Sequence, residues 1–208
     1  MLLMYLQDTY RENDPIFIGE LAAKTGRSGA AVRQSLKRLV DRGKLLRFSE
    51  GIYYFPKQSR LFRSTPPDME QIIIRKYIET GEDTIGYYSG LTLANIAGIT
   101  TQMPAEQCIV TNAEKSRRRI VSIRKRRICL KAPRTAVNQK NKDALSVLDL
   151  VGEAFKYTEY DREETEKRLR AYIRRLGVAK ASVRACLSYY PSKTSKLLLE
   201  MGIYDVLA

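Results

Sequence analysis

The sequence predicts an α+β fold, with a small N-terminal domain of helices and one β-hairpin followed by a larger mixed α/β domain that ends in helices. Three patterns indicate this. Apolar residues recur at helical spacing over residues 1–42, two β-prone runs follow over 45–55, and helix and strand patterns are mixed after residue 68. The proline-containing segment 64–67 is the best linker candidate. We therefore expect domains at residues 1–64 and 68–208.

Three helices are expected before the hairpin, over residues 1–12, 16–25 and 29–42. Ser28 is placed to cap the third helix, and Gly43 follows it where a C-terminal glycine is common. The apolar stripe of this helix consists of Val32, Leu36, Leu39 and Val40.

The hairpin is predicted from two β-prone runs, 45–48 and 52–55, joined by the three-residue loop Ser49-Glu50-Gly51. Helices, a turn, a further helix and a hairpin form the pattern of a winged helix-turn-helix. Such domains place the second helix of the motif in the major groove of DNA. Here that helix is 29–42.

The second domain mixes helices and strands. Residues 86–91 are interpreted as a glycine-containing turn that leads into a helix capped by Ser89 and closed by Gly98. Strands are expected at 107–112, 119–123 and 127–131. Helices are expected at 68–80, 89–97, 143–156, 161–176, 179–189 and 192–203.

The charge distribution favours a phosphate-rich partner. The net charge is +14, and it is concentrated in two blocks. Residues 1–64 carry 12 Lys and Arg against 6 Asp and Glu, and residues 115–142 carry 12 against none. Residues 65–114 are acidic instead, with 2 against 7.

The face of helix 29–42 opposite its apolar stripe is polar and basic. Arg is suited to a bidentate contact with guanine, Gln to adenine, and Lys to phosphate or guanine. Arg27 and Ser28 lie at the helix N-terminus, where backbone N–H groups attract phosphate. A plain solvated helix is the alternative. The predicted DNA contacts are Arg27, Ser28, Arg33, Gln34, Lys37, Arg38, Arg42, Lys44 and Arg47.

The basic run 115–142 is interleaved with apolar residues, which suggests strands with one wet face. Three roles stay open: additional phosphate contacts, contact with RNA or an acidic protein, and a solvated surface. The candidate phosphate contacts are Arg117, Arg118, Arg119, Arg124, Lys125, Arg126 and Arg127.

Several classes of site are not expected. The sequence has no histidine, and Cys108, Cys129 and Cys186 are too widely spaced for a CxxC metal or redox motif. No P-loop or dinucleotide fingerprint is present. We expect no catalytic residues, no metal and no cofactor. The apolar N-terminus lacks the basic leader of a signal peptide and no apolar run is long enough to span a membrane, so we expect a cytoplasmic location without membrane partners.

Two motifs in the second domain carry a family resemblance. They are Gly-Tyr-x-Ser-Gly at 86–90 and Gly-Ile-Thr-Thr-Gln-x-Pro at 98–104. Together with the predicted winged helix, they resemble the AbiEi antitoxin family of AbiE-type (type IV) toxin–antitoxin systems. The similarity runs over most of the chain and is strongest in 16–55 and 86–112.

The resemblance implies an autorepressing antitoxin linked to phage abortive infection. The N-terminal domain would bind inverted repeats in double-stranded DNA of its own promoter, with DNA-contact roles for Arg27, Arg33, Gln34, Lys37 and Arg38. The C-terminal domain would counter a nucleotidyltransferase-like toxin, either by direct contact or by acting on the toxin's target. Two other functions stay open: a ligand-responsive winged-helix transcription factor and, less favoured, a nuclease or nucleotidyltransferase.

Overall fold

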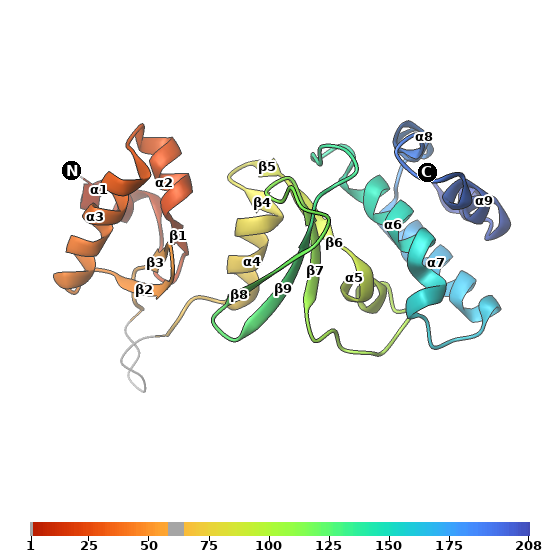
Figure 1. Ribbon diagram of the computed structural model, residues 1–208, viewed down its shortest axis with the longest axis horizontal. Coiled ribbons are helices and arrows are strands. Elements are labelled where there is room, and N and C mark those ends of the chain that lie inside the picture. Colours follow the sequence, from red (N-terminus) through yellow and green to blue (C-terminus); the bar gives the residue numbers. More distant parts are fainter. Residues whose placement is uncertain (1, 58–64) are drawn as a thin grey trace. The chain divides into compact units, whose positions relative to one another are not determined.

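The computed structural model describes residues 2–57 and 65–208 and shows an α+β protein (Figure 1). The described part of residues 1–76 forms one compact unit, and Tyr77–Ala208 forms a second. Met1, where the first predicted helix begins, and Ser64, at the predicted domain boundary, lie outside the described residues. In the described ranges, no helix combines the length and the apolar character that crossing a bilayer requires.

The first unit packs helices against a small antiparallel sheet. Its core gathers buried side chains from every helix before the hairpin, among them Leu6, Leu21 and Leu36. The sheet has the strand order β1-β3-β2. The elements are α1 (Leu2–Thr9), β1 (Ile16–Phe17), α2 (Ile18–Thr25), α3 (Gly29–Asp41), β2 (Leu46–Ser49), β3 (Ile52–Tyr54) and α4 (Met69–Tyr77), the last of which ends at the boundary between the units.

Helix α3 begins and ends as its sequence predicts. The Ser28 hydroxyl accepts a hydrogen bond from the Ala31 N–H at 3.2 Å, which satisfies one of the free donors of the first turn. Gly43 has a φ of +66°, a conformation that glycine adopts without a Cβ clash. The predicted apolar stripe is confirmed, because Val32, Leu36 and Leu39 are buried.

Two predictions in the first unit are wrong in detail. Ile16 and Phe17 were expected to start a helix but form strand β1, because they follow Pro15 and pair with β3 at Tyr53 and Ile52. The hairpin loop is shorter than the predicted three residues. Ser49 pairs with Ile52 through a bulge in β2, so only residues 50 and 51 connect the strands.

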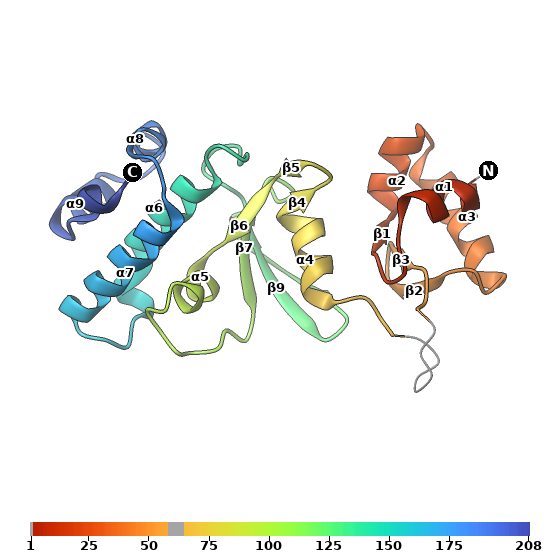
Figure 2. The same ribbon diagram turned by 180° about the vertical axis from the view of Figure 1, so that it is seen from behind.

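The second unit is built on a four-stranded sheet in the order β6-β7-β9-β8, with β7 and β9 parallel and the other pairs antiparallel. Helices α5 and α6 lie on the same side of this sheet (Figure 2). Its strands are β6 (Gly86–Tyr88), β7 (Gln107–Thr111), β8 (Arg119–Ile123) and β9 (Arg126–Lys131), beside a short hairpin of β4 (Glu79–Thr80) and β5 (Asp83–Thr84). Its helices are α5 (Gly90–Ile96), α6 (Lys142–Tyr157), α7 (Arg162–Leu176), α8 (Lys180–Leu187), α9 (Ser192–Glu200) and a 3₁₀ turn (Ile203–Val206).

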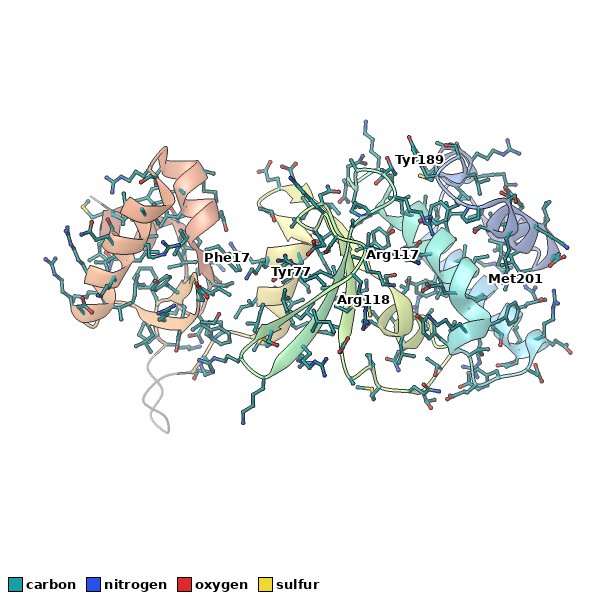
Figure 3. All side chains as sticks on the ribbon, viewed as in Figure 1. Phe17, Tyr77, Arg117, Arg118, Tyr189 and Met201 are labelled. Carbon is teal, nitrogen blue, oxygen red and sulfur yellow. The ribbon has the colours of Figure 1, made fainter. Side chains whose placement is uncertain are left out.

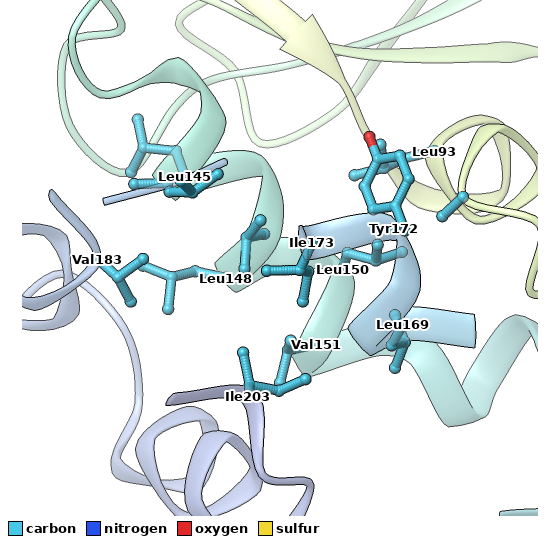
Figure 4. Packing of buried hydrophobic residues seen from close by; sticks show 14 of the residues in the cluster. Leu93, Leu145, Leu148, Leu150, Val151, Leu169, Tyr172, Ile173, Val183 and Ile203 are labelled. Atoms are coloured by element: carbon cyan, nitrogen blue, oxygen red, sulfur yellow. The ribbon is translucent and has the colours of Figure 1, made fainter. Parts of the chain in front are cut away.

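Helix α6 is the centre of the larger core. Leu145, Leu148 and Val151 are fully buried along it and pack with side chains of α5, α7, α8 and the C-terminal turn (Figure 4). A helix that is apolar over so much of its circumference must be covered on several sides. The sequence of α6 therefore accounts for the shorter helices that pack around it, α9 included.

Three predictions for the residues after 67 need correction. Residues 86–88 form strand β6, paired with β7, rather than a turn. The helix expected over 68–80 ends at Tyr77, because Glu79 and Thr80 pair with β5. Ser89 stands before α5, but its side chain makes no capping hydrogen bond, and its carbonyl accepts the Leu93 N–H instead at 3.3 Å.

Candidate nucleic-acid interface

Helix α3 presents a continuous polar face. The 3.6-residue repeat that buries Val32 and Leu36 turns the residues between them outward. Arg27 and Ser28 precede the helix, and Arg47 lies on β2 of the hairpin. Every member of the predicted contact set is exposed: Arg27, Ser28, Arg33, Gln34, Lys37, Arg38, Arg42, Lys44 and Arg47.

The cations of this face are available to an external anion. Within residues 2–57 and 65–208, no carboxylate lies within 4.0 Å of the side-chain nitrogens of Arg33, Lys37 or Arg38. The same is true of Arg27, Arg42, Lys44 and Arg47. Arg47 uses its Nε to donate to the Ser49 carbonyl at 3.3 Å, and its terminal nitrogens have no acceptor among the described residues. Ordinary surface helices mix both charges, so this uncompensated face favours a polyanionic partner.

The second basic set lies in the other unit, on and beside the β8–β9 hairpin. The strands pair from Arg119 to Ile123, and Arg124 and Lys125 form the connecting turn. Arg124 adopts a positive φ of +51° there. The predicted strands are confirmed, and the seven candidate side chains are exposed: Arg117, Arg118, Arg119, Arg124, Lys125, Arg126 and Arg127.

Unlike the α3 face, this set is partly compensated by two carboxylates. Glu106 lies 3.2 Å from Arg118 and 2.5 Å from Arg127, and Glu114 lies 2.6 Å from Arg119. Arg117, Lys125 and Arg126 have no carboxylate within 4.0 Å in the described parts of the chain. The structure therefore divides the basic run into paired arginines and cations that remain open to a partner.

Glu114 is held in its ionised form. Its carboxylate accepts hydrogen bonds from the Ser116 N–H and hydroxyl, the Arg119 guanidinium and the Lys115 N–H. These bonds, those from Ser116 first, lower the pKa of Glu114 to about 2. The residue thus fixes the turn that leads into β8.

Sequence reasoning missed both carboxylates. Glu114 carried a weak local signal, because a carboxylate followed by Lys-Ser can accept hydrogen bonds from the backbone two residues on. Glu106 carried none, since it reaches Arg118 and Arg127 only through the pairing of strands that are distant in sequence.

The two glycine-containing motifs build a packing corner. A Cβ on Gly86 would lie 2.6 Å from the Val110 carbonyl oxygen and clash with the Tyr77 carbonyl. In the second motif Ile99 is fully buried, and Thr101 donates from its N–H to Glu159 at 2.8 Å. These contacts tie β6, α5 and the segment after α6 together. On the residues alone, the motifs therefore serve the fold of the second unit.

Comparison with known proteins identifies a family but no activity. No curated protein matches the sequence significantly. A family model described as "Family of unknown function (DUF6088)" matches residues 16–180, which include α3, the hairpin of the first unit and the whole basic run. The match covers more than half of the chain, and the protein therefore belongs to the DUF6088 family.

Proposed function

We propose that this protein is a cytoplasmic DNA-binding autorepressor and the antitoxin of an AbiE-like type IV toxin–antitoxin system. It binds inverted repeats in its own promoter and counteracts a nucleotidyltransferase-like toxin, as part of abortive infection against phage. The observation that carries the DNA-binding half is the face of α3, on which exposed Arg, Lys and Gln side chains lack carboxylate partners among the described residues.

Three features support a winged helix-turn-helix as the DNA-reading domain. Helices α2 and α3 are separated by a short turn at residues 26–28. Helix α3 buries one stripe against the core of its unit and leaves the opposite face to solvent. The β2–β3 hairpin follows directly and carries the exposed Arg47, in the position of a wing.

The antitoxin half rests on resemblance. The motifs at 86–90 and 98–104 are those that resemble the AbiEi antitoxins. In this structure the two motifs form β6 and the segments that flank α5. They therefore support a fold of the second unit shared with the AbiEi antitoxins, and they do not point to a particular toxin contact.

The DNA-binding proposal is tested by a gel shift on the protein's own promoter. The double variant Arg33→Ala/Lys37→Ala should lose operator binding while its far-UV circular dichroism stays native, because it removes one base-reading and one phosphate-binding side chain. Lys167→Ala/Arg174→Ala is a matched control, since both residues are exposed on α7 and the charge change is equal. Undiminished binding by the α3 variant would overturn the proposal.

The antitoxin proposal is tested by co-expressing the full chain and the proposed neighbouring toxin from foreign promoters. Rescue by both the wild type and Arg33→Ala/Lys37→Ala would separate toxin neutralisation from DNA binding. Rescue by the wild type alone would make the α3 face part of the antitoxin activity. Failure of the wild type to rescue would contradict the antitoxin half and favour a transcription factor without it.

A further inference from the structure

The second unit contains a cavity of about 1190 Å³ between its sheet and helix α6. Its floor includes Cys108 and Val110 from β7 and Cys129 and Lys131 from β9, which share one face because side chains alternate along a strand. Asp149, Glu153 and Lys156 contribute from α6. Cavities for small molecules measure roughly 300–1,000 Å³, so this one can hold a ligand much larger than a phosphate ion.

The cavity lining carries an excess of positive charge. Arg117, Lys131, Arg134 and Lys156 line it, whereas Arg118 is already paired with Glu106. No carboxylate lies within 4.0 Å of Arg117 or Lys131 in the ranges that the structure describes. Arg117 and Arg118 stand side by side at the start of the basic hairpin (Figure 3).

The two acidic residues of the lining differ in their partners. Both oxygens of Asp149 are engaged by tyrosines, with the Tyr87 hydroxyl at 2.9 Å and the Tyr190 hydroxyl at 3.0 Å. Glu153, one helical turn further along α6, has a buried Oε2 that accepts no hydrogen bond from the described residues. A buried acceptor without a donor is costly, which points to a ligand that brings an N–H.

Burial raises the pKa of the Cys108 thiol to about 11, so this residue adds no negative charge to the cavity. The lining thus offers cations for an anion, an unpartnered acceptor for an N–H donor, and the rings of Tyr87 and Tyr157. A nucleotide matches all three, because its phosphate is an anion and its base carries N–H donors and a face that stacks on aromatic rings.

We propose that this cavity is a nucleotide-binding site, in which Arg117, Lys131 and Arg134 hold the phosphate and Glu153 accepts from an N–H of the base. The site goes beyond the proposed function, since neither operator recognition nor toxin neutralisation requires a small ligand. It would make the second unit responsive to a nucleotide.

Isothermal titration calorimetry, in which each probe is titrated into the full chain without DNA, tests this proposal independently of operator binding. The probes are GTP, ATP, UTP, pyrophosphate and glucose 6-phosphate. We expect one nucleotide to bind about tenfold or more tightly than pyrophosphate and glucose 6-phosphate, because the base adds its own contacts. Equal binding of all five probes, or no binding of any nucleotide at about 1 mM, would overturn the proposal.

Single substitutions locate the bound ligand. Lys131→Gln should weaken nucleotide binding about tenfold or more, whereas Lys125→Gln, on the exposed hairpin turn, should leave it unchanged. Arg117→Gln is the second cavity variant if Lys131→Gln does not fold. Glu153→Gln should alter the preference among the three bases without changing competition by pyrophosphate. Equal losses in Lys125→Gln and Lys131→Gln would assign the binding to nonspecific surface charge.

Discussion

Glu114 illustrates how one carboxylate organises the entrance to the basic hairpin. Its folded pKa of about 2 lies below the roughly 4.3 of an unfolded glutamate. A carboxylate with a lowered folded pKa stabilises the protein above its unfolded pKa, and this contribution is lost as the pH falls through the folded value. The effect belongs to the window between about pH 4.5 and pH 2.

We therefore expect Glu114→Gln to lower the melting temperature at neutral pH and to flatten its fall over that acidic window. Thermal melts of the full chain from about pH 7 to pH 2 measure both effects. Glu82→Gln is the control, because Glu82 is exposed in the β4–β5 turn. Parallel pH profiles for the wild type and Glu114→Gln would contradict the assignment.

Tyr190 supports a buried carboxylate in the same unit. Its hydroxyl lies 3.0 Å from Asp149 Oδ1 and 3.1 Å from the Leu145 carbonyl. Burial raises the pKa of Asp149, and hydrogen bonds from Tyr87 and Tyr190 oppose that rise. Removing a partner of a buried polar group leaves that group's desolvation uncompensated.

Tyr190→Phe should thus cost about 1–3 kcal/mol of unfolding free energy. The loss should be larger at about pH 7 than at about pH 4, since the variant raises the pKa of Asp149 further and the ionised form becomes harder to bury. Urea unfolding at both pH values is the measurement. Tyr189→Phe, at a neighbouring side chain that is half-exposed, should change little, and equal losses in the two variants would refute the role of Tyr190.

At the scale of elements, strand β6 depends on a residue without a Cβ. Gly86 packs against the carbonyls of Tyr77 and Val110, so Gly86→Ala must displace β6 from β7. We expect a loss of about 1–3 kcal/mol in chemical unfolding. Gly152→Ala is the matched control within α6. The added methyl group meets only Thr194 Oγ1 at 3.7 Å, and helix propensity favours alanine over glycine by up to about 1 kcal/mol, so this variant should not be destabilised. A neutral Gly86→Ala would mean that β6 adjusts without cost.

Elements with their own periodicity were predictable from sequence, and elements made by distant pairing were not. Helices α3 and α7 repeat apolar residues on one face and carry local start or stop signals, such as Ser28, Asp161 and Gly177. Strands β1 and β6 have two and three residues, too few for a visible alternation, and they exist because β3 and β7 provide hydrogen bonds.

At the scale of the whole molecule, the two blocks of positive charge were visible in the sequence, but their difference was not. The polar face of α3 followed from helical spacing alone, because its residues are local neighbours. The pairing of Arg118 and Arg127 with Glu106 depends on the sheet, and the cavity above Cys108 and Cys129 depends on how α6 covers that sheet. Ion pairs and cavities form only when distant segments fold together. The amino-acid composition therefore overstates the positive charge that the hairpin presents to a partner.

This difference predicts how DNA affinity depends on salt. The logarithm of the observed affinity falls with the logarithm of salt concentration by about 0.9 for each phosphate that a cation neutralises. If the open cations of the hairpin contact phosphate, Lys125→Gln/Arg126→Gln should reduce the slope by about 2 on operator and on unrelated DNA alike, because phosphate contacts carry no sequence information.

The matched variant is Arg118→Gln/Arg119→Gln, which removes the same charge from two arginines that are already paired with Glu106 and Glu114. Because these arginines must first exchange a carboxylate for a phosphate, we expect their slope to change by less than about 1. Fluorescence anisotropy of labelled duplexes over a range of salt concentrations measures all the slopes. Equal changes in both variants would mean that the ion pairs break on DNA. An unchanged slope in Lys125→Gln/Arg126→Gln would show that the hairpin does not contact DNA. Its basic residues would then face RNA, an acidic protein or solvent.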